Sequence, residues 1–297
     1  MKPSLDIPEG LLDNVNEFSE EFYKRFTLRH APGPIKLTDD IEKNYQFPTF
    51  YGDVTCAMAI CFCNYQKALE VVQKDLGPKV KPVGMGGGRA LVAFSNYEYK
   101  KVNGVRPYNE IAVAIPIMVN SSFSPPILPM VMGSFSHFGY YIAHMPVTSY
   151  ENTLRGHKIW GLPKVTQEID IIQDGNDCVT TAFEDDGKPY LTIRVPKDGK
   201  KQTFDETGYL YSRHDGVLKR SKTNFKADFA VTKNMKTLFN SDVSPEKSYI
   251  EIGDSPSAKM LNDLEISKLP FQFRYAEHMT ACFDLADEKL PTWASNL

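Results

Sequence analysis

Turn signals between β-type runs constrain the fold of this chain more than any other feature of its sequence. The clearest is Asn103-Gly104, which separates the apolar-rich runs 90–99 and 105–119. An Asn-Gly pair favours a tight turn whose twist matches that of two antiparallel strands, so this segment predicts a long hairpin. Asp186-Gly187 predicts a second hairpin for the same reason.

Strand-like runs make up most of the remaining chain, whereas helical spacing of apolar residues is rare. Residues 65–76 have helical spacing and end at Gly77-Pro78, and residues 196–204 have the composition of a charged loop. Many short strands with few helices predict a β-rich α+β fold, in which a large antiparallel sheet carries a few peripheral helices. The strand-like runs are 54–63, 90–99, 105–119, 130–134, 140–147, 165–172, 178–184, 190–195, 207–212, 216–221, 226–231, 248–252 and 271–285.

The first 50 residues differ from the remainder of the chain. Within residues 10–26, apolar side chains recur every three or four positions, which predicts an amphipathic helix. Residues 31–53 contain several prolines and are expected to form an extended arm. We therefore predict an N-terminal helix and arm over 1–50 and one β domain over 51–297.

Composition excludes several classes of function. The chain has 297 residues, a formal net charge of -3 and no block of like charge, so neither nucleic acid nor a membrane is an expected partner. No apolar run has the length of a signal peptide core or a membrane span, which favours a cytoplasmic location. The five cysteines form no Cys-x-x-Cys pair, and the glycines at 84–88 lead into a strand, so neither a metal nor a cofactor is expected.

Lys164 lies at a change of local structure. A polar, helix-compatible segment is followed by the apolar residues 159–163, and Pro163 ends the helix so that Lys164 begins a strand. Most lysines extend their charge to solvent, which is the simplest interpretation of this one. If apolar neighbours bury it instead, the ammonium form is penalised, the pKa falls and the free amine can attack a ketone.

Glu110 interrupts the apolar run 105–119. In a strand, its side chain shares a face with Ala112 and Ala114, while Ile111 and its alternate neighbours occupy the other face. The carboxylate either faces solvent or lines an internal cavity. The adjacent alanines leave room for a ligand and therefore favour the cavity.

Two motifs resemble the acetoacetate decarboxylase family. Residues 156–164, G-H-K-I-W-G-L-P-K, resemble its active-site stretch, in which a Gly-Arg-Glu helix end, a short link and Pro-Lys-Lys precede a strand. Tyr108-Asn109-Glu110, followed by an apolar strand ending at Pro116, resembles its Tyr-x-Glu strand, and Phe94 lies at the interval that the family shows. The resemblance covers about residues 50–285.

This resemblance implies a fold, an assembly and a chemistry. The implied fold is a closed or nearly closed antiparallel sheet around an internal cavity that encloses the lysine, and the implied assembly is a homo-oligomer. Lys164 would form a Schiff base with a keto acid or related carbonyl substrate, and Glu110 would act as acid and base. The residues expected to bind substrate are Tyr108 and Tyr141, which would orient it, Arg155 and His157, which would receive a carboxylate, and Trp160.

The chain also departs from the family pattern. Val165 replaces the lysine that follows the nucleophile, Ser95 replaces a second carboxylate, and no arginine lies near 53–55. Three hypotheses therefore stay open. The protein is a lyase that decarboxylates a β-keto acid through an iminium, or a Schiff-base aldolase, dehydratase or isomerase acting on a larger carbonyl metabolite, or a non-catalytic small-molecule binding protein.

Overall fold

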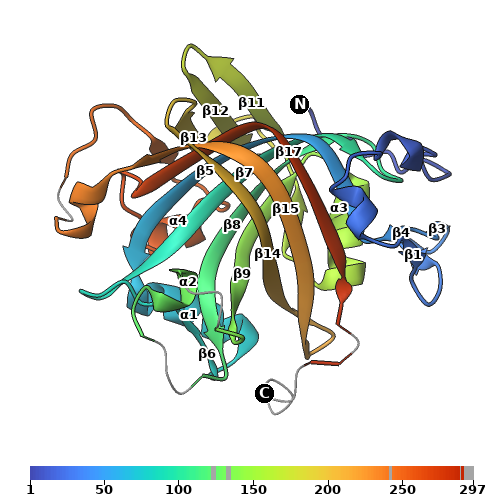
Figure 1. The fold of residues 1–297 in the computed structure, drawn as a ribbon, viewed down its shortest axis with the longest axis horizontal. Coiled ribbons are helices and arrows are strands. Elements are labelled where there is room, and N and C mark those ends of the chain that lie inside the picture. The colour runs from blue at the N-terminus through green and yellow to red at the C-terminus, as the bar shows by residue number, and fades with distance from the viewer. Residues whose placement is uncertain (122–124, 132–134, 241–242, 288, 291–297) are drawn as a thin grey trace.

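The computed structural model describes residues 1–121, 125–131, 135–240, 243–287 and 289–290. Within these ranges, seven strands close into a barrel in the order β9, β14, β15, β17, β5, β7, β8 and back to β9 (Figure 1). Neighbours pair antiparallel except β9 and β14, which pair in parallel. The barrel strands are β5 (Thr49–Asn64), β7 (Arg89–Val102), β8 (Tyr108–Val119), β9 (Phe138–Val147), β14 (Lys200–His214), β15 (Val217–Lys233) and β17 (Gln272–Ala286). The predicted β-rich α+β class is confirmed.

A smaller four-stranded sheet covers one side of the barrel wall. It comprises β11 (Ile169–Asp174), β12 (Asp177–Phe183), β13 (Pro189–Pro196) and β16 (Ile250–Ile252). Its apolar side chains form one buried cluster with outward-facing residues of β5, β7 and β8 and with the helices α1 (Tyr65–Leu76) and α4 (Lys259–Asp263). The main apolar core of the protein therefore lies outside the barrel, between its wall and this sheet.

Strand alternation separates the two faces of the barrel wall. On β8, Ile111, Val113 and Ile115 belong to the outer cluster, whereas Ala112 and Ala114 belong to a second cluster inside the barrel. The inner cluster draws on all seven barrel strands, because successive side chains of a strand point to opposite faces. Glu110 therefore lies on the inner face with the two alanines, as the alternation predicts.

Both predicted hairpins and the predicted helix are present. β7 pairs with β8 across the turn at Asn103, and β12 pairs with β13. Helix α1 begins where the side chain of Asn64 accepts hydrogen bonds from the amides of Gln66 and Lys67, and ends at Gly77 with φ of 96°. Capping oxygens and a glycine in the left-handed region are the expected signals for these two helix ends.

Three predictions from sequence are wrong. Within the predicted strand 130–134, residues 130–131 lie in the short helix α2 (Leu128–Val131), and residues 132–134 lie outside the described ranges. Residues 200–204, predicted as part of a charged loop, lie in β14, because β14 and β15 pair along their whole length across the turn at Asp215-Gly216. Residues 10–26 do not form one helix but contain two short 3-10 turns, Val15–Glu17 and Tyr23–Arg25. Phe18 and Phe22 instead pack with Tyr23 against Phe50 of β5.

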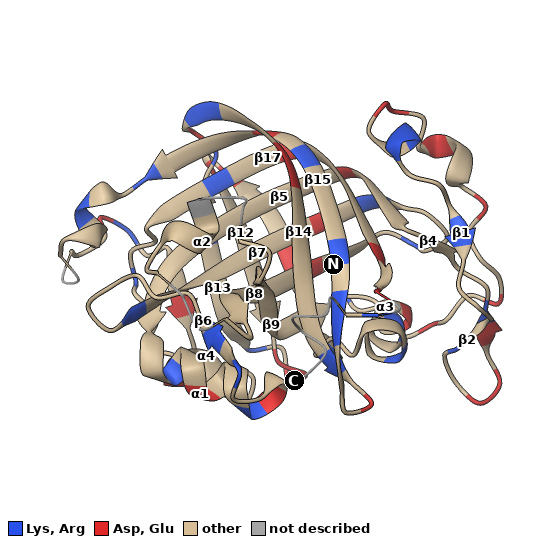
Figure 2. Ribbon diagram, turned by 60° about the horizontal axis from the view of Figure 1, so that its bottom comes forward, with Lys and Arg blue, Asp and Glu red and all other residues tan. Residues whose placement is uncertain are grey.

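The remaining elements are short. The N-terminal arm contains β1 (Arg29–His30), β2 (Ile35–Lys36), β3 (Glu42–Lys43) and β4 (Gln46–Phe47), as expected of an extended segment. The others are β6 (Val80–Pro82), β10 (Lys164–Thr166), α2 (Leu128–Val131), α3 (Tyr150–Arg155), a π-helix (Gly156–Trp160) and a 3-10 turn (Met235–Leu238). Basic and acidic residues are interspersed along the ribbon (Figure 2). Within the described ranges, no helix is both long and apolar enough to cross a membrane.

Candidate active site

Lys164 follows directly after the end of a helix whose capping and last residues are well defined. Ser149 caps α3, and α3 continues directly into the π-helix Gly156–Trp160. Gly161 ends that helix with φ of 63°, a backbone conformation that favours glycine. A Cβ atom at this position would also lie only 2.5 Å from the carbonyl oxygen of Arg213, so there is no space for a larger residue. Lys164 then begins β10, which pairs in parallel with β9.

The structure brings Lys164 and Glu110 into contact. The Nζ atom of Lys164 donates to Oε2 of Glu110 over 2.6 Å, although 54 residues separate the two in sequence. Lys164 is only 5% exposed and Glu110 only 2% exposed. The simplest interpretation of Lys164, a lysine extended into solvent, is therefore excluded.

Gly156 makes room for the lysine side chain. A Cβ atom on this residue would lie 2.5 Å from Cδ and 2.8 Å from Cγ of Lys164. Real side-chain contacts are not that short, so any larger residue at this position would displace the lysine. Gly156 itself has helical backbone angles, which means that space rather than backbone freedom requires the glycine.

The surroundings lower the pKa of Lys164. Burial is the largest cause, because a desolvated ammonium is penalised, while the Glu110 carboxylate acts in the opposite direction. The Arg155 guanidinium adds a further lowering contribution. Val165 is 38% exposed, so the position that carries a second lysine in the family pattern does not face the interior here. Arg155, and not the residue at position 165, therefore contributes positive charge near this amine.

Tyrosine side chains surround the pair on the inner face. The Tyr99 hydroxyl donates to Oε1 of Glu110 over 3.2 Å, and the ring of Tyr108 lies 5.5 Å from the Nζ atom of Lys164. Tyr99 also packs against the rings of Tyr51, Tyr97 and Tyr108. Burial raises the pKa of Tyr99 and Tyr108 well above the usual value, so both phenols stay protonated near neutral pH.

Arg155 is held by the protein itself. It is 1% exposed, and its two terminal nitrogens donate to Oδ1 of Asn152 and to Oγ1 of Thr49 over 2.9 and 3.0 Å. The guanidinium also lies over the ring of Tyr45, with 4.5 Å to the centroid. These contacts hold the guanidinium in place, while its Nε atom is buried without a hydrogen bond. The role expected for Arg155, receiving a substrate carboxylate, stays a prediction.

The other three expected substrate-binding residues lie further from the pair. His157 is exposed, and its Nε2 atom bonds to the carbonyl oxygen of Lys164 over 2.7 Å. Trp160 packs on Phe283 in the inner cluster and donates its indole N–H to the carbonyl oxygen of Asp284. Tyr141 belongs to the outer cluster, on the opposite face of the wall. Of the expected substrate-binding residues, the structure therefore brings Tyr108 and Arg155 near Lys164 and Glu110.

Sequence reasoning assigned no role to Tyr99 or Gly156. Tyr99 could have been found by alternation, because it is the cross-strand partner of Tyr108 in the predicted hairpin. Gly156 lies in the lysine motif, but only the structure shows which atoms approach it.

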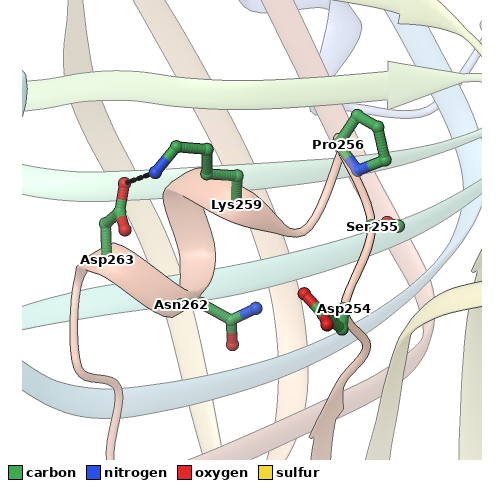
Figure 3. Close-up of a pocket in the computed structure, with 6 residues that line it drawn as sticks. All are labelled: Asp254, Ser255, Pro256, Lys259, Asn262 and Asp263. Atoms are coloured by element: carbon green, nitrogen blue, oxygen red, sulfur yellow. Dashed lines mark hydrogen bonds and ion pairs between the residues drawn. The ribbon is translucent and has the colours of Figure 1, made fainter.

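No cluster of three or more His, Cys, Asp or Glu side chains is placed to hold a metal ion in the part of the chain that the structure describes. A surface pocket beside α4 is lined by Asp254, Ser255, Pro256, Lys259, Asn262 and Asp263, with an ion pair of 2.9 Å between Lys259 and Asp263 (Figure 3). None of these residues contacts the pair inside the barrel.

Comparisons with known proteins identify a family and a fold for this chain. Residues 33–266 match the family described as acetoacetate decarboxylase (ADC). Among solved structures, an acetoacetate decarboxylase aligns with 81% of this chain and 88% of its own, at 16% identity and a TM-score of 0.52. The acetoacetate decarboxylase from Legionella pneumophila subsp. pneumophila str. Philadelphia 1 aligns with 92% of this chain and 93% of its own, at 12% identity and a TM-score of 0.53. At these identities the structural likeness shows a common fold. No curated protein matches the chain.

Proposed function

The chain belongs to the acetoacetate decarboxylase family, and we propose that it is an enzyme that forms a Schiff base between Lys164 and a keto acid. One observation carries the proposal: a buried amine, whose pKa is lowered by burial, lies 2.6 Å from a buried carboxylate inside a barrel. An amine that loses its proton easily is a nucleophile, and the adjacent carboxylate is within reach to accept that proton.

The first half of the reaction makes the iminium. The Lys164 ammonium passes one proton to Glu110, and the free amine attacks the carbonyl carbon of the substrate. Glu110 then returns the proton to the carbinolamine hydroxyl, which leaves as water and gives a positively charged iminium beside an ionised carboxylate. The hydroxyl of Tyr99 donates to the other oxygen of Glu110 and orients it for both transfers.

Decarboxylation of a β-keto acid is the reaction that we assign to this iminium. The bond between the carboxylate and the adjacent carbon breaks, its electron pair moves to the iminium nitrogen, and carbon dioxide leaves an enamine. Glu110, after taking a proton from solvent, protonates the enamine carbon. Water then attacks the resulting iminium and releases the ketone product and the Lys164 ammonium. One proton is consumed for each carbon dioxide released.

A second candidate is an aldolase, dehydratase or isomerase that uses the same enamine. This alternative is favoured by the departures from the family pattern, since Ser95 replaces the second carboxylate on the inner face and the position of the second lysine is occupied by the exposed Val165. Tyr99 and Tyr108 contact the pair instead, and Tyr51 and Tyr97 pack against Tyr99, so phenol hydroxyls are among the polar groups near it.

Borohydride trapping separates these hypotheses. The protein is incubated with acetoacetate, pyruvate and longer keto acids, reduced, digested and analysed by mass spectrometry. We expect a reduced adduct on Lys164 and, with β-keto acids, release of carbon dioxide. An adduct without carbon dioxide would favour the second candidate. No adduct with any carbonyl compound would end the Schiff-base proposal and favour a binding protein.

Two variants control the experiment. Lys158→Met removes an exposed lysine close in sequence, and should leave trapping unchanged. Lys164→Met combined with Glu110→Gln removes the amine without leaving a buried carboxylate alone, so that the loss of trapping is measured in a folded protein.

A further inference from the structure

Arg274 is a second cation on the inner face of the barrel. On β17, Phe273 and Tyr275 belong to the outer cluster, whereas Ala276 belongs to the inner cluster, so alternation directs Arg274 inward. The guanidinium lies over the ring of Phe204, 4.6 Å from its centroid, and Phe204 packs against the inner cluster. The contact with Phe204 and the alternation along β17 therefore both place the Arg274 side chain on the inner face.

The charge of Arg274 has no ionic partner. Its Nε atom is buried without a hydrogen bond, and no carboxylate lies within ion-pair distance among the residues that the structure describes. Glu206, on the facing strand β14, is exposed and acts on Arg274 only at longer range. Burial lowers the pKa of Arg274, yet a guanidinium keeps its proton near neutral pH. The residue as a whole is only partly exposed, and a partly desolvated cation without an ionic partner is stabilised when an anion binds to it.

Strand pairing places Arg274 across the barrel from the Lys164–Glu110 pair. Glu110 lies opposite Tyr97, Tyr97 opposite Cys56, and Cys56 opposite Ala276, which is two residues from Arg274. Glu110 and Arg274 are thus three strands apart in a ring of seven, or roughly 14 Å along the wall at about 4.8 Å for each strand. Three strands from any point of such a ring is nearly the opposite wall.

The inner face between the two sites is not completely sealed. Met58, Tyr97 and Tyr140 all lie on this face and pack against the inner cluster, but each keeps partial exposure. Tyr140 interacts electrostatically with Arg274, and Tyr97 with Glu110 and Tyr140. Both tyrosines therefore lie near enough to these charged groups to interact with them electrostatically.

We propose that Arg274 binds a carboxylate of the substrate while Lys164 holds its carbonyl carbon, so that the substrates are keto acids with an anionic group several bonds from the reacting ketone. The part of this inference in which Lys164 holds the carbonyl carbon rests on the proposed function. A guanidinium recognises a carboxylate through charge-assisted, bidentate hydrogen bonds. If Arg274 paired with the carboxylate that is lost as carbon dioxide, it would stabilise the ground state and slow decarboxylation. We therefore assign Arg274 to a second carboxylate, which stays on the product.

The test compares acids with their neutral esters. Trapping at Lys164 is measured against concentration for levulinate and 6-oxoheptanoate, each beside its methyl ester, in wild-type protein and in Arg274→Gln. We expect Arg274→Gln to raise the half-saturating concentration of 6-oxoheptanoate by about tenfold to a hundredfold, the range of a hydrogen-bonded charge, and to leave its ester unchanged. Arg274→Lys should restore part of the difference, because it keeps the charge without the fork of donors.

Lys222→Gln is the matched control, since it removes an equal charge from the exposed side of β15 and should change neither acid nor ester. An equal shift for acid and ester in Arg274→Gln would indicate a structural role and overturn the proposal. If the half-saturating concentration of 6-oxoheptanoate were equal in wild type and Arg274→Gln, the proposal would be overturned as well.

Heptanoate keeps the two proposals separable, because it has the carboxylate but no carbonyl group. Its binding is measured by calorimetry in wild type, in Arg274→Gln and in the double variant Lys164→Met, Glu110→Gln. Binding that is lost in Arg274→Gln and kept in the double variant supports the anion site even if no ketone is ever trapped. Heptanoate binding that is equal in wild type and Arg274→Gln, or absent from both, overturns the anion site while trapping at Lys164 still decides the Schiff base.

Discussion

On β8, odd and even residues meet two different environments. Ile111, Val113 and Ile115 are each 0% exposed and pack against the small sheet and the helices outside the barrel. Glu110, Ala112 and Ala114 point the other way, toward the inner cluster, where Glu110 meets Lys164 and several tyrosines pack together. One strand thus contributes both to a conventional apolar core and to a buried ionic site.

The difference between the two faces shows how this protein tolerates a desolvated charge pair. A buried ion pair contributes little or no net stability, since desolvation offsets its attraction. Apolar burial on the outer face supplies a favourable term that does not depend on the inner face. Substitutions on the outer face should therefore act on stability, and substitutions on the inner face on reactivity.

Removing one partner of the ion pair should have the largest effect. Lys164→Met leaves Glu110 buried without its cation, and we expect a loss of about 3 to 5 kcal/mol in the free energy of unfolding. The double variant Lys164→Met, Glu110→Gln should recover that loss and can exceed wild type by about 1 to 4 kcal/mol. Urea denaturation at neutral pH measures both. Equal destabilisation by the single and the double variant would contradict the unpaired-charge explanation.

Next in size is a cavity on the outer face. Ile115→Ala should cost about 2 to 5 kcal/mol, because the site is fully buried, while trapping at Lys164 per folded molecule stays at the wild-type level. Ala112→Leu is the matched inner-face variant: it should cost about 1 to 3 kcal/mol and reduce trapping. Denaturation and trapping are measured on the same samples. If Ile115→Ala reduced trapping as much as Ala112→Leu, the two faces would not be independent.

Gly156→Ala should act on reactivity more than on stability. The added methyl group would meet the Lys164 side chain at 2.5 Å, and displacement of the amine by about 1 Å should slow trapping about a hundredfold, or ~2.7 kcal/mol. Gly33→Ala is the control, since nothing lies within 4 Å of that position. Borohydride trapping rates, with circular dichroism as a check on folding, would show the effect. Unchanged trapping in Gly156→Ala would mean that the lysine has a second productive conformation.

The smallest expected effect is a pH dependence that originates outside the barrel. Burial lowers the pKa of His144 to about 4, and its Nε2 atom lies 3.1 Å from the hydroxyl of Tyr190 in the small sheet. Unfolded chains bind a proton near pH 6.5, so the neutral ring contributes its full stability above that pH and loses it as pH falls toward 4.

The unfolding free energy of wild type should therefore drop by about 1 to 3 kcal/mol more than that of His144→Gln between pH 6.5 and pH 4. Trapping at neutral pH should be the same in both proteins. Parallel stability curves for the two proteins would show that His144 is not the titrating group.

Local sequence patterns predicted those parts of the fold that depend on neighbouring residues. The turns at 103–104 and 186–187, the helix at 65–76 and the two faces of β8 follow from backbone preference and side-chain alternation, and all four are confirmed. The segment 10–26 failed because aromatic residues at helical spacing can also bury against strands β5 and β17 without forming a helix. The start of β14 was missed because exposed strand residues carry no apolar alternation.

The sequence by itself supplied the two chemical groups, Lys164 and Glu110, along with Gly161 and Pro163, which end the helix before the lysine. Tertiary structure alone decided their contact, because it depends on β10 pairing with β9 and β9 pairing with β8. It also brought Arg155 near enough to Lys164 to affect its pKa and placed Tyr141 on the outer face. The physical reason is that alternation determines which side chains share a face, whereas desolvation, and hence the pKa of an amine, depends on every strand that closes the barrel around it.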